Sequence, residues 1–227
     1  MKIDGNFVRE IREEIFPAMQ SDGENSGFAL PGSTIELLGT LVRRYGIQRV
    51  FEFGSGRSTK EFLRLGCEVA CIEDSKHWMD ETLRTIPPEE MVRLHPIVRP
   101  LRTVWHRGVP MKAWGAEIAP ELRDADLVLI DSPSYPPFRE IPLLLSLAHA
   151  KNALIVVDDA NIPTVRRFCE RLAGDVDRVT SCSTTNDHGL FCFARIENSG
   201  EVDRWRGVVE SMKAWRRYFS ALTPASN

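Results

Sequence analysis

Acidic side chains recur at the ends of apolar segments of this chain. Five acids follow this pattern: Glu52, Glu73, Asp74, Asp131 and Asp158. Carboxylates in such positions can accept hydrogen bonds from hydroxyl groups, take up a proton in general acid–base chemistry, or bind a hard divalent cation. Because ligands of open α/β sheets bind outside the carboxyl ends of the parallel strands, we expect these side chains to gather around one ligand site.

A glycine-containing turn follows the first of these acids. Residues 50–59 read Val-Phe-Glu-Phe-Gly-Ser-Gly-Arg-Ser-Thr. Gly54 and Gly56 allow the backbone to approach a ligand closely, and a helix that starts after them would offer free N–H groups to an anionic part of that ligand. Glu73 follows Gly54 at close to the separation of about 20 residues at which a Rossmann-type sheet places an acid on a ribose. The pattern predicts a nucleotide-type cofactor loop; an ordinary strand–turn–helix without a ligand is the alternative.

Alternating apolar and polar segments predict the elements that carry these residues. Strands are expected at 49–53, 67–72, 92–98, 126–131 and 153–158, and helices at 58–65, from 75 to Pro87, around 143–147 and at 163–174. Ser58 and Glu61 form a capping-box pattern at the first of these helices, and the runs 176–183 and 189–196 are typical of a hairpin. We therefore predict an α/β fold: a doubly wound, Rossmann-like sheet of about seven strands, mostly parallel, with a terminal antiparallel hairpin.

The order acid-x-Gly-x-Gly at Glu52, Gly54 and Gly56 resembles motif I of the class I S-adenosylmethionine (SAM) methyltransferases. The run 52–59 is especially similar to a branch of small bacterial enzymes related to the catechol and caffeoyl-CoA O-methyltransferases, and the terminal hairpin is a second resemblance to the class I sheet. Ser58 departs from the third glycine of motif I. Thr59 stands where a dinucleotide fingerprint has its third glycine, which disfavours NAD or FAD. The resemblance covers roughly residues 30–196 and implies a SAM-dependent methyltransferase that acts on a small-molecule hydroxyl.

The same resemblance implies a cofactor site. Its residues would be Glu52, Gly54, Ser55, Gly56, Ser58, Thr59, Glu73, Asp74, Leu101 and Asp131. Glu73 would bind both ribose hydroxyls, and Asp74 and Leu101 would flank the adenine. A solvated acid at the end of a strand is the alternative for Glu73.

Three residues are candidates for catalysis: Asp131, Asp158 and His188. Methyl transfer is an in-line displacement at an activated sulfonium carbon, so the protein mainly positions the acceptor and helps to remove its proton. Asp131 would orient or deprotonate the acceptor, and capping of the following turn is its alternative role. His188 would act as a general base if the hairpin folds over the site.

Metal-dependent catechol-type enzymes carry an Asp after the fourth strand and an Asp-Asn pair after the fifth. This chain has Asp131 after the fourth strand and Asp158-Asp159 after the fifth. Three oxygen ligands would suit Mg²⁺ or Ca²⁺, which would lower the pKa of a bound hydroxyl. The departure from Asp-Asn leaves a metal-free base as an alternative, and Asn161 before Pro163 also fits a helix N-cap.

Composition limits the classes of partner. The 227 residues, of which 43% are hydrophobic, suit one α/β domain, and the net charge of −3 predicts no general attraction to nucleic acid or an anionic membrane. We expect a small-molecule acceptor as partner. The five cysteines are an odd number and indicate reduced thiols in a cytoplasmic protein. The N-terminus lacks the apolar core of a signal peptide, and no run reaches the roughly 18 apolar residues of a membrane span.

The chain divides into three segments by pattern. Residues 1–32 predict a helix and a mobile loop that could form a lid, 33–200 the SAM-binding domain, and 201–227 a basic amphipathic helix that packs on the domain or makes a homodimer contact. Two other functions are compatible with the fold: a SAM-binding module without catalysis, and an NAD-dependent oxidoreductase. Methylation of nucleic acid is opposed by the net charge.

Overall fold

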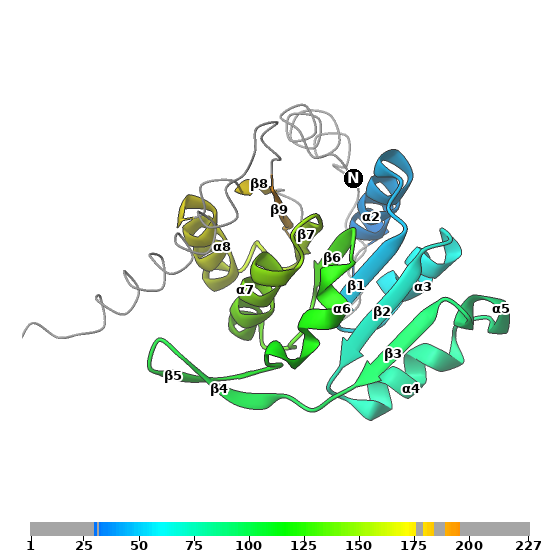
Figure 1. Cartoon of the computed structure of the whole chain (residues 1–227), viewed down its shortest axis with the longest axis horizontal. Coiled ribbons are helices and arrows are strands. Elements are labelled where there is room, and N and C mark those ends of the chain that lie inside the picture. The colour runs from blue at the N-terminus through cyan, green and yellow to red at the C-terminus, as the bar shows by residue number, and fades with distance from the viewer. Residues whose placement is uncertain (1–29, 31, 176–178, 184–188, 196–227) are drawn as a thin grey trace, which may run out of the picture.

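A computed structural model describes residues 30, 32–175, 179–183 and 189–195 (Figure 1). Its centre is a seven-stranded sheet with the order β3-β2-β1-β6-β7-β9-β8. The strands are β1 Arg49–Phe53, β2 Glu68–Glu73, β3 Leu94–Val98, β6 Leu127–Ile130, β7 Leu154–Val157, β8 Val179–Ser183 and β9 Phe191–Arg195. The five neighbouring strands β3, β2, β1, β6 and β7 pair in parallel, whereas β9 runs antiparallel to both β7 and β8. The predicted doubly wound sheet with a terminal antiparallel hairpin is confirmed.

Helices cover both faces of this sheet (Figure 1). One set is α2 Gly32–Tyr45, α3 Arg57–Arg64, α4 Lys76–Arg84 and the short α5 Pro88–Met91, and the other is α6 Ala119–Arg123, α7 Glu140–His149 and α8 Pro163–Asp175. Alternation along the strands divides the core in the same way, because neighbouring side chains of a strand point to opposite faces. In β1, Val50 packs with Leu41 of α2 and Phe62 of α3, whereas Phe51 packs with residues of α6, α7 and α8.

A second, smaller sheet lies between β3 and α6. Strands β4 Arg102–His106 and β5 Val109–Ala113 form an antiparallel hairpin that packs on Ile141 of α7 through Met111 and Ala113. The sequence analysis did not predict this hairpin, because most of its side chains are exposed and give little apolar alternation. Its one clear signal is Gly108 in a two-residue turn, where it and Arg107 both have positive φ.

The start of α3 differs from the predicted capping box. The helix begins at Arg57 with Gly56 as its N-cap, and the Gly56 N–H donates to Oγ1 of Thr59 over 2.9 Å. Ser58 is therefore inside the helix, and the predicted pairing of Ser58 with Glu61 as a capping box is wrong. The reason is that the Ser58 side chain is buried and hydrogen-bonds Glu52 of β1.

Most of the predicted N-terminal segment 1–32 and all of the predicted C-terminal helix 201–227 lie outside the described residues, as does His188. Across the described ranges, none of the helices is both long and apolar enough to cross a membrane. Four cysteines whose side chains the structure describes are buried, Cys67, Cys71, Cys169 and Cys192, and the first three of them are free thiols. Burial raises the pKa of the Cys67 thiol to about 11, so this thiol is protonated and unreactive near neutral pH.

Candidate active site

The glycine loop lies between the carboxyl ends of three strands. The Gly54 N–H donates to the Ile72 carbonyl of β2 over 2.9 Å, and the Asp131 N–H donates to the Phe53 carbonyl of β1 over 3.1 Å. Gly54 has φ +109, and a Cβ at this position would lie 3.2 Å from Cβ of Ser132. A glycine is required here because both the backbone angle and the close approach of the residue after Asp131 exclude a side chain.

Glu52 lies beneath this loop with only 1% of its surface exposed. Ser58 and Thr59 of α3 hydrogen-bond its carboxylate, while burial is the larger effect and raises the pKa of Glu52 to about 7. Its Oε2 has no hydrogen-bond partner among the described residues. Ser58 and Thr59 therefore hydrogen-bond Glu52 below the loop. A ligand or a water could supply the missing partner of the buried Glu52 Oε2.

Glu73 closes β2 on the other side of the loop and is 6% exposed. Its Oε1 accepts hydrogen bonds from the N–H groups of Asp74 and Ser75 over 3.0 and 3.1 Å, and its Oε2 lies 3.5 Å from the Ser55 hydroxyl. Burial raises the pKa of Glu73, and the Ser75 N–H opposes this shift. The Asp74 side chain is exposed, and Leu101 packs half-buried against the apolar cluster beneath α6 and α7.

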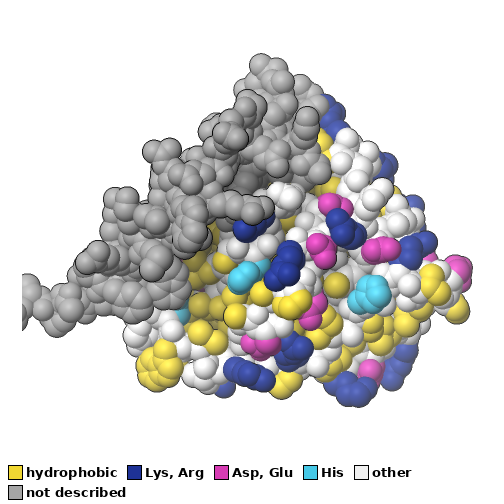
Figure 2. All heavy atoms as spheres, viewed as in Figure 1, with side chains coloured by type: hydrophobic (Ala, Val, Ile, Leu, Met, Phe, Trp, Pro, Cys, Tyr) yellow, Lys and Arg dark blue, Asp and Glu magenta, His cyan; other side chains and the backbone are white. Residues whose placement is uncertain are grey.

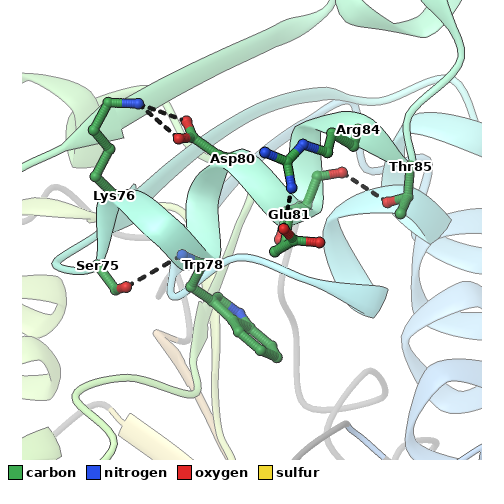
Figure 3. A network of polar contacts seen from close by, with 8 residues as sticks. Ser75, Lys76, Trp78, Asp80, Glu81, Arg84 and Thr85 are labelled. Atoms are coloured by element: carbon green, nitrogen blue, oxygen red, sulfur yellow. Dashed lines mark hydrogen bonds and ion pairs between the residues drawn. The ribbon is translucent and has the colours of Figure 1, made fainter.

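Helix α4 contributes Trp78 to the glycine loop. Ser75 caps the helix by accepting from the Trp78 N–H, and the Trp78 indole Nε1 donates to the Ser55 carbonyl over 2.8 Å. Figure 3 shows the indole on the opposite side of the helix from the exposed Lys76–Asp80 ion pair. The sequence analysis did not predict this contact, because it joins residues on different elements. Trp78 fixes the backbone of the loop while 47% of its surface stays exposed.

Three aspartates gather after β6 and β7, as the sequence analysis predicted. One carboxylate oxygen from each of Asp131, Asp158 and Asp159 lies within 4.8 Å of the others. Asp158 is buried, and the side chains of Asp131 and Asp159 keep 33% and 20% of their surfaces exposed. Asp159 has φ +60, which is uncommon for a residue with a side chain. The cluster is therefore reachable from solvent mainly at Asp131.

Arg139 is the one member of this cluster that the sequence analysis missed. It ends the 3₁₀ turn η4 Pro136–Arg139 and is 4% exposed. Its guanidinium forms ion pairs with Asp131 at 3.2 Å and with Asp159 at 2.8 Å, and its Nε donates to the Pro133 carbonyl over 3.2 Å. The segment Pro-Pro-Phe-Arg gives no sequence signal beyond a turn, so only the folded chain reveals the contact.

The pKa of Asp131 lies well above its usual range. Burial is the largest cause, the charge of Asp158 adds to it, and the Arg139 guanidinium opposes it. Carboxylates so close together cannot all ionise as easily as isolated ones. A raised pKa makes the Asp131 carboxylate a stronger base than an isolated aspartate, so Asp131 has the chemistry of a general base.

Gly189, before β9, packs on the loop that follows β7. Its carbonyl accepts from the Ala160 N–H over 2.8 Å, and a Cβ on Gly189 would lie 2.4 Å from the Asn161 nitrogen. Asn161 has an exposed side chain on the same loop.

The donor set of the cluster has the oxygen ligands that Mg²⁺ or Ca²⁺ prefers. The arrangement does not fit such an ion, however, because a buried guanidinium already contacts two of the three carboxylates. An ion that bound all three aspartates would compete with Arg139 for the same oxygens. The Arg139 guanidinium thus places a positive charge beside the carboxylates of Asp131 and Asp159.

Comparison with known proteins matches neither a protein-family model nor a curated protein. Solved structures do match. A methyltransferase from Geobacter sulfurreducens has a TM-score of 0.57 at 18% identity over 81% of this chain and 89% of its own. The methyltransferase PaMTH1 of Podospora anserina, bound to S-adenosylhomocysteine (SAH), has a TM-score of 0.55 at 12% identity over 85% and 93%. An O-methyltransferase from Bacillus cereus in complex with SAH has a TM-score of 0.52 at 15% identity over 86% and 92%.

The chain has the class I methyltransferase fold. Here the glycine loop follows β1 and Glu73 ends β2, while Asp131 follows β6 and Asp158 follows β7. Figure 2 shows Lys and Arg interspersed with Asp and Glu on the described part of the face in view, without an extended basic surface there. That distribution agrees with the net charge of −3.

Proposed function

We propose that this protein is a SAM-dependent methyltransferase that methylates a hydroxyl group of a small molecule. One observation carries the proposal: the glycine loop with its flanking acids packs so closely on the residue next to Asp131 that a Cβ added at Gly54 would lie 3.2 Å from Cβ of Ser132. A cofactor on this loop would therefore lie beside a carboxyl group that can take up a proton. The class I methyltransferase fold, shared with two structures that hold SAH, supports the same assignment.

The cofactor would lie across the ends of β1 and β2. Glu73 would accept the ribose hydroxyls through Oε2, since its Oε1 is already held by two backbone N–H groups. The backbone from Gly54 to Gly56 would contact the methionine part of SAM. The unpartnered Oε2 of Glu52 lies below this part and offers an acceptor to the ammonium group or to a water that bridges to it.

Asp131 would act on the acceptor. As the acceptor oxygen forms its bond to the methyl carbon, the carbon–sulfur bond breaks and leaves SAH, and the hydroxyl proton passes to the Asp131 carboxylate. The sulfonium carbon is already activated, so holding the acceptor in line is the main task of the protein. Asp158 raises the pKa of Asp131 and so makes it a stronger base. A divalent ion on Asp131, Asp158 and Asp159 would be another way to activate the acceptor, and the contacts of Arg139 oppose it.

Calorimetric titration with SAM and SAH tests the proposal. We expect micromolar dissociation constants, and we expect Glu73→Gln to weaken both by about 10- to 100-fold, because a hydrogen bond to a charged acceptor contributes about 1.5–3 kcal/mol. Glu81→Gln is the matched control, since Glu81 forms an exposed ion pair with Arg84 of the same helix (Figure 3). Absence of SAM and SAH binding to the native protein, or equal binding by Glu73→Gln, would refute the assignment.

A further inference from the structure

We infer that Arg139 supplies the positive charge that a divalent ion would supply in a metal-dependent catechol-type enzyme, so that the acidic pocket of this protein excludes metal and its reaction needs none. The part concerning the reaction rests on the proposed function. The part concerning metal exclusion rests on the pocket alone and can be tested without an acceptor.

The guanidinium lies close to two carboxylates and one carbonyl, although Nη1 makes no hydrogen bond within the described residues. Nη2 contacts Asp131, Nη1 contacts Asp159, and Nε donates to the Pro133 carbonyl. The side chain is 4% exposed, so water contributes little to its solvation. A buried charge is stable only where such partners surround it. Arg139 is therefore held in the pocket by a hydrogen bond to the Pro133 carbonyl and by the charges of Asp131 and Asp159.

A divalent ion and this guanidinium would compete for the same carboxylate oxygens. A Ca²⁺ or Mg²⁺ ion binds carboxylate oxygens at about 2.0–2.6 Å, and the guanidinium nitrogens lie 3.2 and 2.8 Å from oxygens of two of the three aspartates. An ion bound to the same two carboxylates would meet a fixed positive charge a few ångströms away. A guanidinium cannot relieve that repulsion by losing a proton.

Separating Arg139 from its two carboxylates would also cost free energy. If its carboxylates turned to an ion, the guanidinium would remain buried with only the Pro133 carbonyl as an identified partner. Removing one partner of a buried ion pair is strongly unfavourable. The weak binding expected of a crowded site would not offset this loss. Arg139 is thus a positioning residue that acts through Asp131 and Asp159 and occupies the electrostatic role of the ion.

Titration with Mn²⁺ in the presence of SAM tests the inference, because Mn²⁺ is a spectroscopic and calorimetric probe for an oxygen-ligand site. We expect the native protein to bind Mn²⁺ no more tightly than about 1 mM, a weak-site value. Arg139→Gln removes the cation and keeps a polar side chain, and we expect it to bind Mn²⁺ at least about 10-fold more tightly. Arg139→Lys keeps the charge and should behave like the native protein. If Arg139 had only a structural role, Arg139→Gln and Arg139→Lys would not differ in Mn²⁺ affinity.

Arg171→Gln is the matched control. Arg171 pairs with Glu140 on neighbouring α7 and, within the described residues, forms no ion pair with the three aspartates, so its loss should leave Mn²⁺ binding unchanged. If Arg139→Gln does not fold, the Mn²⁺ affinities of the native protein and of Asp159→Asn still test the inference. Native binding tighter than about 100 μM that is lost in Asp159→Asn would overturn the inference, and so would a folded Arg139→Gln without Mn²⁺ binding.

Failure of the proposed function gives a different result. SAM titration of the same samples would then show no binding to the native protein, whereas the Mn²⁺ comparison of native protein, Arg139→Gln and Arg139→Lys would still be readable without SAM. SAM binding together with tight native Mn²⁺ binding would retain the methyltransferase and refute the role of Arg139.

Discussion

The carboxyl edge of the sheet has two halves that hold their acids by different means. In the cofactor half, at the ends of β1 and β2, hydroxyl groups of Ser58 and Thr59 hold Glu52, and backbone N–H groups hold Glu73. In the acceptor half, at the ends of β6 and β7, the guanidinium of Arg139 joins two aspartates. Neutral donors leave the cofactor half able to receive a cationic ligand such as SAM, whereas the acceptor half already contains its own cation.

The largest difference between the halves should appear on removal of Arg139. We expect Arg139→Gln to lower the free energy of unfolding by about 4 kcal/mol, because it breaks a buried ion pair and leaves close carboxylates uncompensated. Arg171→Gln breaks a pair whose Arg side chain is 35% exposed and should cost about 1 kcal/mol. Urea denaturation measures both. Equal losses of unfolding free energy would mean that the ion pairs of Arg139 contribute no more than an ordinary surface ion pair.

Glu52 tests the cofactor half through pH. Its folded pKa of about 7 lies above the ordinary value of 4.5, so the folded state holds its proton more tightly than the unfolded chain. The native protein should therefore lose roughly 3 kcal/mol of stability from this group between about pH 4.5 and 7, with no further change above. Urea denaturation at pH 4.5 and 8 should show this loss diminished in Glu52→Gln. The same pH dependence in Glu52→Gln and native protein would contradict the burial of an ionisable Glu52.

Two glycines with nearly the same backbone angle separate strain from contact. Gly189 has φ +61 and would place a Cβ 2.4 Å from the Asn161 nitrogen, whereas Gly46 has φ +60 and has open space around it. We expect Gly189→Ala to cost about 2–3 kcal/mol and Gly46→Ala about 1 kcal/mol in thermal or urea unfolding. Because the clash is in the acceptor half, the SAM affinity of Gly189→Ala should stay native. A large loss of SAM affinity would show that the two halves are coupled.

The smallest predicted effect concerns Trp78. Trp78→Phe removes the indole bond to the Ser55 carbonyl and should weaken SAM binding about three- to fivefold, as expected for one neutral hydrogen bond. Trp105→Phe, on the exposed β4–β5 hairpin, should leave the affinity unchanged. Calorimetry distinguishes the two variants. Equal effects would indicate that the loop does not depend on Trp78.

The sequence predicted the cofactor half better than the acceptor half, and the reason is physical. Glu52, Gly54, Gly56 and Thr59 are neighbours in the chain, so their spacing contains most of their geometry. The acidic cluster was also predictable, since parallel strands end at one edge of the sheet. Arg139 was not, because it reaches this edge from a 3₁₀ turn and its role depends on where that turn packs. Ser58 was misassigned as a cap because the buried Glu52 attracts its hydroxyl.

A crystal structure of the protein with SAH tests the central claim most directly. The account predicts SAH along the backbone from Gly54 to Gly56, with its ribose hydroxyls on Glu73 and its sulfur facing Asp131. Arg139 should still join Asp131 and Asp159 in that complex. SAH bound elsewhere, or its ribose away from Glu73, would contradict the assignment of both halves.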